Sequence, residues 1–284
     1  MHALYTLTDD NFVPICKVLL RSFFDNNSWF TGDVVILHEP THCALSEESQ
    51  VSLSEVVPEQ ACLVFHEVDF SSYEKLFATV LEAAPESRLR TLSCLLKWDI
   101  FKNTSYNKSV YLDADTLVLN DISFLFEVDQ GFVACANGLS ITDTCKHCKI
   151  YNPGEPSITI NGGMYSVNSR FTNSSFFEGL ITHSESLDFK SFYKKLGKGR
   201  IGEQDMVSLF LRYFERRLVS TQYNIIRRAL PDIYLDNNPD LLPSLKIIHY
   251  TSKKPNAGYN KIRLRGKHRD YKKTHDLWMN YYER

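Results

Sequence analysis

Residues 109–120 read SVYLDADTLVLN, an apolar strand interrupted by two aspartates, Asp113 and Asp115. On a strand, side chains two residues apart point to the same face, so the two carboxylates are expected side by side where the strand ends. They repel each other, and the local sequence offers no basic partner. A divalent cation with oxygen ligands, Mg²⁺ or Mn²⁺, that also bridges a phosphate would compensate them. The alternative is a turn in which Asp115 caps a helix and Asp113 is a solvated strand end.

Apolar runs and helical stretches alternate in the first half of the chain. A helix with Pro14 in its first turn follows the first run, and residues 88–103 read as a long helix just before the strand of the aspartates. Alternation of this kind predicts an α/β fold with a Rossmann-like, mostly parallel central sheet flanked by helices, which binds ligands at the carboxyl ends of its strands. The runs expected as strands are 3–7, 33–38, 61–68 and 108–113.

The second half of the chain changes rhythm but shows no repeat or linker. We expect a catalytic domain over residues 1–256 and a basic, aromatic tail over residues 257–284. The strands expected here are 131–137, 157–168 and 245–250, and the helices are roughly 171–196 and 204–215.

The charge of the chain is small but unevenly distributed. The net charge is -2, which argues against a nucleic-acid partner, yet the last 39 residues carry +8 and the rest -10. The aromatic, basic tail could rest on the anionic inner face of a membrane, or it could be a solvated helix with one packed face.

No apolar run is long enough to span a membrane and no signal peptide is recognisable, so we expect a cytoplasmic protein, with possible peripheral membrane association. Seven cysteines at irregular spacing fit reduced thiols. Cys145 and Cys148 could bind a structural zinc or be two ordinary loop thiols.

Two chemistries fit the DADTL string at residues 113–117. In haloacid-dehalogenase-type phosphatases such a string supplies a nucleophilic aspartate and an acid/base. In nucleotide-sugar transferases it holds a metal on the donor diphosphate. A phosphatase usually begins its fold on this strand and has a later GDxxxD-like acid string, whereas here three strands come first and no such string follows.

Five segments in order make the chain similar to glycosyltransferase family 8, which includes glycogenin and bacterial lipopolysaccharide galactosyl- and glucosyltransferases. The resemblance covers most of residues 3–256 and implies a GT-A type fold. The segments are YTLTDDNF (5–12), the stretch 98–127 with the two aspartates, INGGMYSVN (160–168), GEQDMVSLF (202–210) and IIHYTSKKPN (247–256).

The resemblance implies a role for individual residues in binding a UDP-sugar with Mn²⁺ or Mg²⁺. Phe12 would stack on uracil, and Lys254 would neutralise the diphosphate as it leaves. Cys94 stands where the family has a basic residue that reaches the donor, and Arg90 is the expected substitute. The implied metal ligands are Asp113, Asp115 and His249; the implied donor-binding residues are Thr8, Asp9, Asn11, Ala114 and Gly163; the implied catalytic residues are Asn161, Glu203 and Gln204.

The family retains the anomeric configuration of the transferred sugar. Gln204 is a poor nucleophile because an amide oxygen is only weakly basic, so the acceptor is expected to enter on the face that the diphosphate leaves. The resemblance therefore implies a metal-dependent retaining hexosyltransferase that moves galactose or glucose to a glycan acceptor, in lipopolysaccharide or surface polysaccharide synthesis. A glycogenin-like self-glucosylating enzyme is the alternative within the family, and the oligomeric state stays open.

Overall fold

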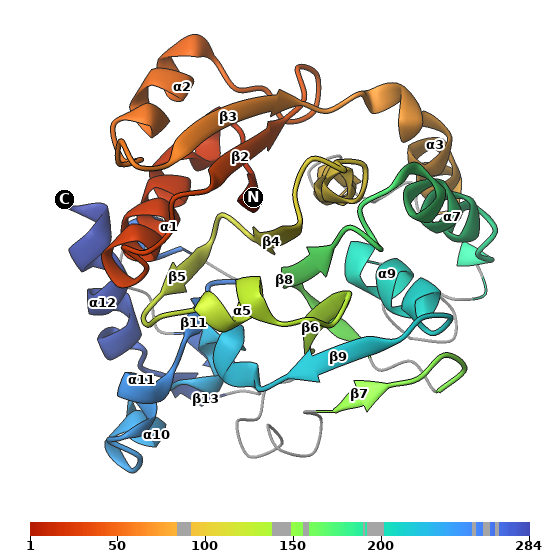
Figure 1. Cartoon of the computed structure of the whole chain (residues 1–284). Helices are drawn as coiled ribbons and strands as arrows, with labels where there is room; N and C mark the ends of the chain where they lie inside the picture. Colours follow the sequence, from red (N-terminus) through yellow and green to blue (C-terminus); the bar gives the residue numbers. More distant parts are fainter. Residues whose placement is uncertain are drawn as a thin grey trace.

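The computed structural model describes residues 1–83, 92–137, 149–155, 159–189, 191, 202–251, 254–257, 262–264 and 267–284. The predicted α/β fold with a large, mostly parallel sheet flanked by helices is confirmed (Figure 1). The strand order is β3-β2-β1-β4-β8-β6-β9-β7. The strands are β1 (His2–Leu7), β2 (Asp33–His38), β3 (Cys62–Glu67), β4 (Lys108–Leu112), β6 (Phe132–Ala136), β7 (Ile150–Tyr151), β8 (Ile160–Asn168) and β9 (Arg216–Val219).

The first four strands along the sheet, β3, β2, β1 and β4, are all parallel to one another. Strand β8 then runs antiparallel between β4 and β6, so it sits next to the strand that leads to the aspartates. Strands β1, β2 and β4 are buried along nearly their whole length, as their apolar runs predict, whereas the edge strand β3 stays partly exposed.

Helical segments cover both faces of the sheet. One face packs against α3 (Glu74–Ala83), η3 (Cys94–Phe101), α7 (Ser174–Glu185) and α9 (Glu203–Leu211), with side chains such as Tyr5 and Leu37 pointing into that layer. Alternate residues such as Leu4 and Ile36 point to the other face, against α1 (Val13–Asn26), α2 (Glu47–Ser54) and α5 (Ser123–Glu127). The alternation follows from the two-residue repeat of a strand.

A smaller sheet extends the carboxyl side of the large one. Its order is β10-β11-β5, where β11 runs antiparallel to β5 and pairs His249 with Thr116. A hairpin of β12 and β13 follows. The remaining elements are β5 (Thr116–Val118), β10 (Ile225–Ile226), β11 (Ile247–His249), β12 (Ile262–Leu264), β13 (Lys267–Arg269), α10 (Asp232–Asp236), α11 (Leu241–Ser244), α12 (Lys272–Tyr282) and the 3₁₀ turns η1 (Asp10–Phe12), η2 (Phe70–Ser72), η4 (Thr221–Tyr223), η5 (Arg227–Ala229) and η6 (Pro255–Ala257).

The last helix, α12, packs beside the first helix, α1, although the two lie near opposite ends of the chain (Figure 1). Trp278 of α12 is fully buried and packs in an apolar cluster with residues of α1 and β11. Arg21 of α1 donates hydrogen bonds to the carbonyl oxygens of Tyr281 and Tyr282, at 2.9 and 3.5 Å, and so caps the negative end of α12. One side of the predicted tail is therefore packed into the molecule.

Three expected helices differ from the prediction. The helix expected over roughly 171–196 is observed as α7, Ser174–Glu185. Residues 94–101 form the 3₁₀ segment η3 rather than the end of an α-helix, while residues 84–91 lie outside the described part of the chain. Helix α9 ends at Leu211, and the chain enters β9 at Arg216, which is buried. Within the described residues, no helix is long and apolar enough to cross a membrane.

Candidate active site

The two aspartates lie in the short turn between β4 and β5, and their backbone is held on two sides. The Asp113 amide donates to the carbonyl of Gly163 in β8 at 3.0 Å, and the amide of Tyr250, just after β11, donates to the Asp115 carbonyl at 2.9 Å. Thr116 closes the turn, because its amide and hydroxyl both donate to the Asp113 carbonyl, at 3.0 and 2.9 Å. The turn is thus fixed between the large sheet and the small one.

His249 reaches both carboxylates from the end of β11. Its Nε2 lies 3.0 Å from Asp115 Oδ1 and 3.4 Å from Asp113 Oδ2. One ligand atom from each of the three residues fits within 4.8 Å of the others. Two carboxylate oxygens and an imidazole nitrogen are a donor set that suits Mn²⁺ or Mg²⁺, so the residues present fit a divalent cation. The structure brings together the three residues that the sequence predicts as metal ligands.

Mutual attraction sets the ionisation of these groups. Burial alone would lower the pKa of His249, but attraction to Asp115 and hydrogen bonds to both carboxylates raise it to about 9. Burial alone would raise the pKa of Asp113, yet Lys97 and His249 hold it well below its ordinary value. His249 and Lys254 likewise lower the pKa of Asp115 against the effect of burial. Both carboxylates therefore stay ionised near neutral pH and can bind a cation.

Lys97 is the basic partner of the aspartate pair, and sequence reasoning missed it. Its side chain is only 3% exposed, and its Nζ donates to Asp113 Oδ1 at 2.7 Å, to the Gly162 carbonyl at 3.0 Å and to Glu203 Oε1 at 3.2 Å. Tyr111 donates to the same oxygen of Asp113 at 2.8 Å, which leaves Oδ2 as the oxygen facing His249. Arg90, the predicted substitute for the missing basic residue, lies outside the described residues.

The geometry of η3 explains why Lys97 faces the site. A 3₁₀ helix has three residues per turn, so residues 94 and 97 share one face. Cys94 and Lys97 accordingly line the same pocket. Residues three and four apart are neighbours in an α-helix as well, so the expected helix would also have placed residue 97 near Cys94.

Two consecutive glycines of β8 let side chains from two directions approach the strand closely. A Cβ on Gly162 would lie 1.8 Å from Glu203 Oε1, and a Cβ on Gly163 would lie 2.3 Å from Cε1 of His249. Because neighbouring residues of a strand face opposite sides, one glycine makes room for the acid of α9 and the other for the histidine of β11. The pair is a packing requirement of this site.

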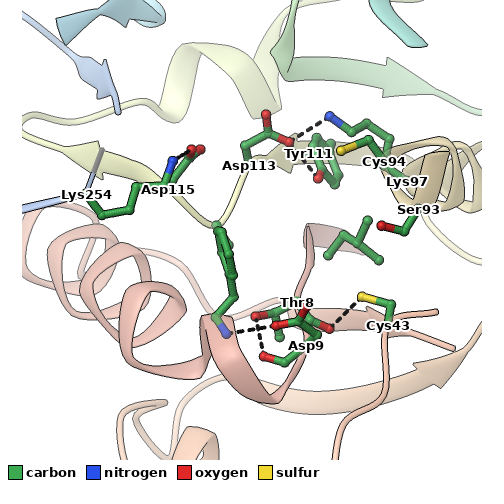
Figure 2. Close-up of a pocket in the computed structure, with 13 residues that line it drawn as sticks. Thr8, Asp9, Cys43, Ser93, Cys94, Lys97, Tyr111, Asp113, Asp115 and Lys254 are labelled. Atoms are coloured by element: carbon green, nitrogen blue, oxygen red, sulfur yellow. Dashed lines mark hydrogen bonds and ion pairs between the residues drawn. The ribbon is translucent and has the colours of Figure 1, made fainter. Parts of the chain in front are cut away.

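A single pocket joins most of the predicted donor-binding residues (Figure 2). Asp9 also has a structural role, because its Oδ1 accepts a hydrogen bond from the Phe12 amide at 2.9 Å and begins η1. Asn11 is exposed and does not line the pocket. The lining residues are Leu7, Thr8, Asp9, Phe12, Cys43, Ser93, Cys94, Lys97, Tyr111, Asp113, Ala114, Asp115 and Lys254.

Lys254, which also lines this pocket, donates hydrogen bonds to Asp115 and to the carbonyl of Tyr250.

The predicted catalytic residues Asn161, Glu203 and Gln204 lie on β8 and at the start of α9. Asn161 Oδ1 accepts from the Gly163 amide at 3.0 Å, and Gln204 Oε1 accepts from the Gly162 amide at 3.3 Å. Lys97 connects Glu203 to Asp113, because its Nζ donates to both carboxylates. Cys145 and Cys148 lie outside the described residues.

Comparisons with known proteins agree with this arrangement. The model of glycosyl transferase family 8 matches residues 3–255. The galactosyltransferase LgtC, solved with donor and acceptor sugar analogs, is similar with a TM-score of 0.64 at 14% identity, over 100% of this chain and 95% of that chain. Mouse xyloside xylosyltransferase 1 gives a TM-score of 0.54 at 16% identity, over 88% and 97% of the two chains.

The glycosyltransferase GlyE of Streptococcus pneumoniae TIGR4 gives a TM-score of 0.58 at 17% identity, over 99% of this chain and 61% of that chain. A search of curated proteins found no match. The structural likenesses confirm the predicted GT-A fold. Because the family model spans nearly all of the chain as well, the protein belongs to glycosyltransferase family 8.

Proposed function

We propose that this protein is a metal-dependent retaining hexosyltransferase that moves galactose or glucose from a UDP-sugar to a glycan acceptor. The observation that supports it best is the cluster of Asp113, Asp115 and His249, beside a pocket in a family 8 fold. These three side chains would hold Mn²⁺ or Mg²⁺, which supplies positive charge for the diphosphate of the donor. The phosphatase alternative is not favoured, because the family model matches and β4 is not the first strand of the sheet.

The nucleotide would lie along the wall formed by Thr8, Asp9 and Phe12. Phe12 is partly exposed in the pocket, which suits stacking on uracil. The Nζ of Lys254 is 5.8 Å from the centre of the Phe12 ring and is bonded to Asp115, so it stands between the nucleobase wall and the metal ligands. A short rotation of the Lys254 side chain would bring its charge to a diphosphate bound there.

The sugar would extend from the aspartates toward Asn161, Glu203 and Gln204. The amide oxygen of Gln204 already accepts a hydrogen bond from Gly162, which makes it a still weaker nucleophile. We therefore favour entry of the acceptor hydroxyl on the face from which the diphosphate departs. In that mechanism the protein contributes the orientation of the two sugars and charge at the leaving group.

The acceptor would be a glycan of lipopolysaccharide or of another surface polysaccharide. Peripheral contact with a membrane remains part of this proposal, but it would depend mainly on charged side chains, because Tyr271 and Trp278 are buried and Tyr281 and Tyr282 pack partly buried against the same apolar cluster. Some of those charges are already paired with acids of the fold: Arg284 with Asp25, and Lys273 with Asp236. Self-glucosylation of the glycogenin kind is not favoured by the comparisons with known structures.

A panel of UDP-sugars tests the proposal. UDP-glucose and UDP-galactose should raise the thermal unfolding midpoint when Mn²⁺ is present. They should have little effect when excess chelator removes the Mn²⁺. The product of the preferred donor, formed with a sugar acceptor, should keep the anomeric configuration in its NMR spectrum. Absence of any metal-dependent shift, or an inverted product, would contradict the assignment.

A further inference from the structure

Tyr250, the residue after His249, contacts two residues of the candidate site through its backbone. Strand β11 ends at His249, so the chain beyond it needs other bonds to stay in place. The Tyr250 amide donates to the Asp115 carbonyl at 2.9 Å, and the Tyr250 carbonyl accepts a hydrogen bond from Lys254. One residue therefore ties the end of β11 to the turn of the aspartates and to the lysine beside it.

The side chain of Tyr250 connects the same residue to α12. The ring is fully buried in the apolar cluster that contains Trp278, and the two ring centres are 6.3 Å apart. The Tyr250 hydroxyl donates to the carbonyl oxygen of Thr274, in the first turn of α12, at 2.6 Å. A residue that bonds Asp115 with its backbone thus bonds the last helix with its side chain.

A buried arginine fixes this contact from a third direction. Arg227 follows β10, whose last residue pairs with His249, so it lies beside Tyr250. Its guanidinium carbon is 5.3 Å from the centre of the Tyr250 ring and 5.5 Å from the centre of the Tyr271 ring. Its Nε donates to Thr274 Oγ1 at 3.2 Å. The start of α12 and the ring of Tyr250 are therefore held by one cation.

We propose that Tyr250 is a positioning residue that couples the docking of α12 to the metal site. While α12 is docked, the hydroxyl bond holds Tyr250, and with it the Asp115 backbone, where a bound cation needs them. The inference rests on the proposed function, because it assumes that Asp113, Asp115 and His249 bind Mn²⁺. Such coupling is reciprocal: if docking of α12 strengthens Mn²⁺ binding, bound Mn²⁺ must stabilise the docked helix by the same factor.

A purely structural role for the hydroxyl would behave differently. The bond would then stabilise α12 equally with and without metal, and its loss would leave Mn²⁺ affinity unchanged. Coupling instead requires that Mn²⁺ slows the local opening of α12, and that this effect depends on the Tyr250 hydroxyl.

The test measures amide hydrogen exchange of the full chain with and without saturating Mn²⁺, and Mn²⁺ affinity by electron paramagnetic resonance. Amides of α12 that exchange faster than those of β1 and β4 are compared, because they report local opening rather than global unfolding. In wild type, Mn²⁺ should slow their exchange about tenfold, within the usual range of coupling between sites. Tyr250→Phe keeps the ring without the hydroxyl, so it should reduce this slowing to less than about twofold and weaken Mn²⁺ binding by about fivefold.

Arg21→Met is the matched control, because Arg21 holds the other end of α12 through the carbonyls of Tyr281 and Tyr282. Its loss should speed exchange in α12. Mn²⁺ affinity should stay as in wild type, since α12 remains mostly docked and the Tyr250 hydroxyl bond is intact. Arg227→Met is a second variant of the link and should weaken Mn²⁺ binding in the same direction as Tyr250→Phe.

Mn²⁺ affinity within about twofold of wild type in folded Tyr250→Phe would overturn the inference. So would an equal loss of affinity in Arg21→Met, which would indicate general loosening of α12. Circular dichroism follows folding, and should Tyr250→Phe not fold, the same comparison between Arg227→Met and Arg21→Met decides. If wild type binds no Mn²⁺, the proposed function fails and the inference with it; if wild type binds Mn²⁺ and exchange in α12 does not change, only the inference fails.

Discussion

The glycine next to the proposed metal site gives the sharpest test of that site's geometry. Substituting Gly163→Ala would place a Cβ 2.3 Å from Cε1 and 2.4 Å from Nδ1 of His249. Carbon atoms in contact are about 3.5 Å apart, so the imidazole would have to move by about 1 Å. Neither partner can retreat easily, because Gly163 bonds the Asp113 amide through its carbonyl, and His249 pairs with Thr116 in the small sheet.

Metal ligands tolerate little displacement, since ligand distances vary by only about 0.2 Å. A shift of about 1 Å at one of three protein ligands should therefore weaken Mn²⁺ binding by about 10- to 100-fold, the range seen when ligand orientation is disturbed. The measurement is a titration of the protein with Mn²⁺ alone, with free Mn²⁺ counted by electron paramagnetic resonance. Thermal unfolding without metal shows whether the variant keeps its fold.

Gly202→Ala is the control for this experiment. A Cβ on Gly202 would meet Asp205 Oδ2 and Gln204 Cγ at 3.7 Å, which is ordinary contact, so Mn²⁺ affinity should stay as in wild type. The reasoning fails if Gly163→Ala, folded, binds Mn²⁺ within about twofold of wild type. It also fails if both alanine variants lose metal to the same extent.

Three further predictions concern the metal ligands and the last helix. Asp113→Asn should abolish the Mn²⁺-dependent rise in unfolding temperature with UDP; a retained rise would exclude Asp113 as a ligand. Because the pKa of His249 is raised to about 9, protons compete with the metal below that pH, so Mn²⁺ affinity should increase by up to about tenfold per unit as pH rises toward 9, as followed by calorimetry. Trp278→Ala should cost about 3–5 kcal/mol in urea unfolding, whereas Trp29→Ala, at an exposed site, should cost clearly less; equal losses would contradict the packing of α12.

The strands of the large sheet could be predicted because each buried strand is a short apolar run. The runs at 3–7, 33–38 and 108–113 became β1, β2 and β4 within about one residue at either end. The reversal at β8 could not be read in this way, because an apolar run does not state its direction. The two-residue strands β7 and β10 are too short for any pattern to distinguish them from loops.

The proximity of Asp113, Asp115 and His249 could be predicted from the order of short motifs, but the contact of Lys97 with Asp113 could not. Every residue of η3 from Leu95 to Phe101 is buried, so no polar face shows which period the helix follows. The sequence prediction chose Arg90, one turn before Cys94, whereas the basic residue that reaches Asp113 is Lys97, three residues after Cys94. The role of Gly162 was similarly hidden, because a glycine in a strand does not say which side chain needs the space.

The packing of α12 on α1 has a consequence for the nascent chain during synthesis. Ile15 and Val18 of α1 share an apolar cluster with Trp278, Leu117 and Ile248. Because these partners come much later in the chain, α1 leaves the ribosome long before they are made. Until α12 is made, the nascent chain presents this side of α1 to water or to a chaperone. Ribosome-bound chains that stop before residue 272 should therefore be cleaved by protease near α1 more readily than the finished protein.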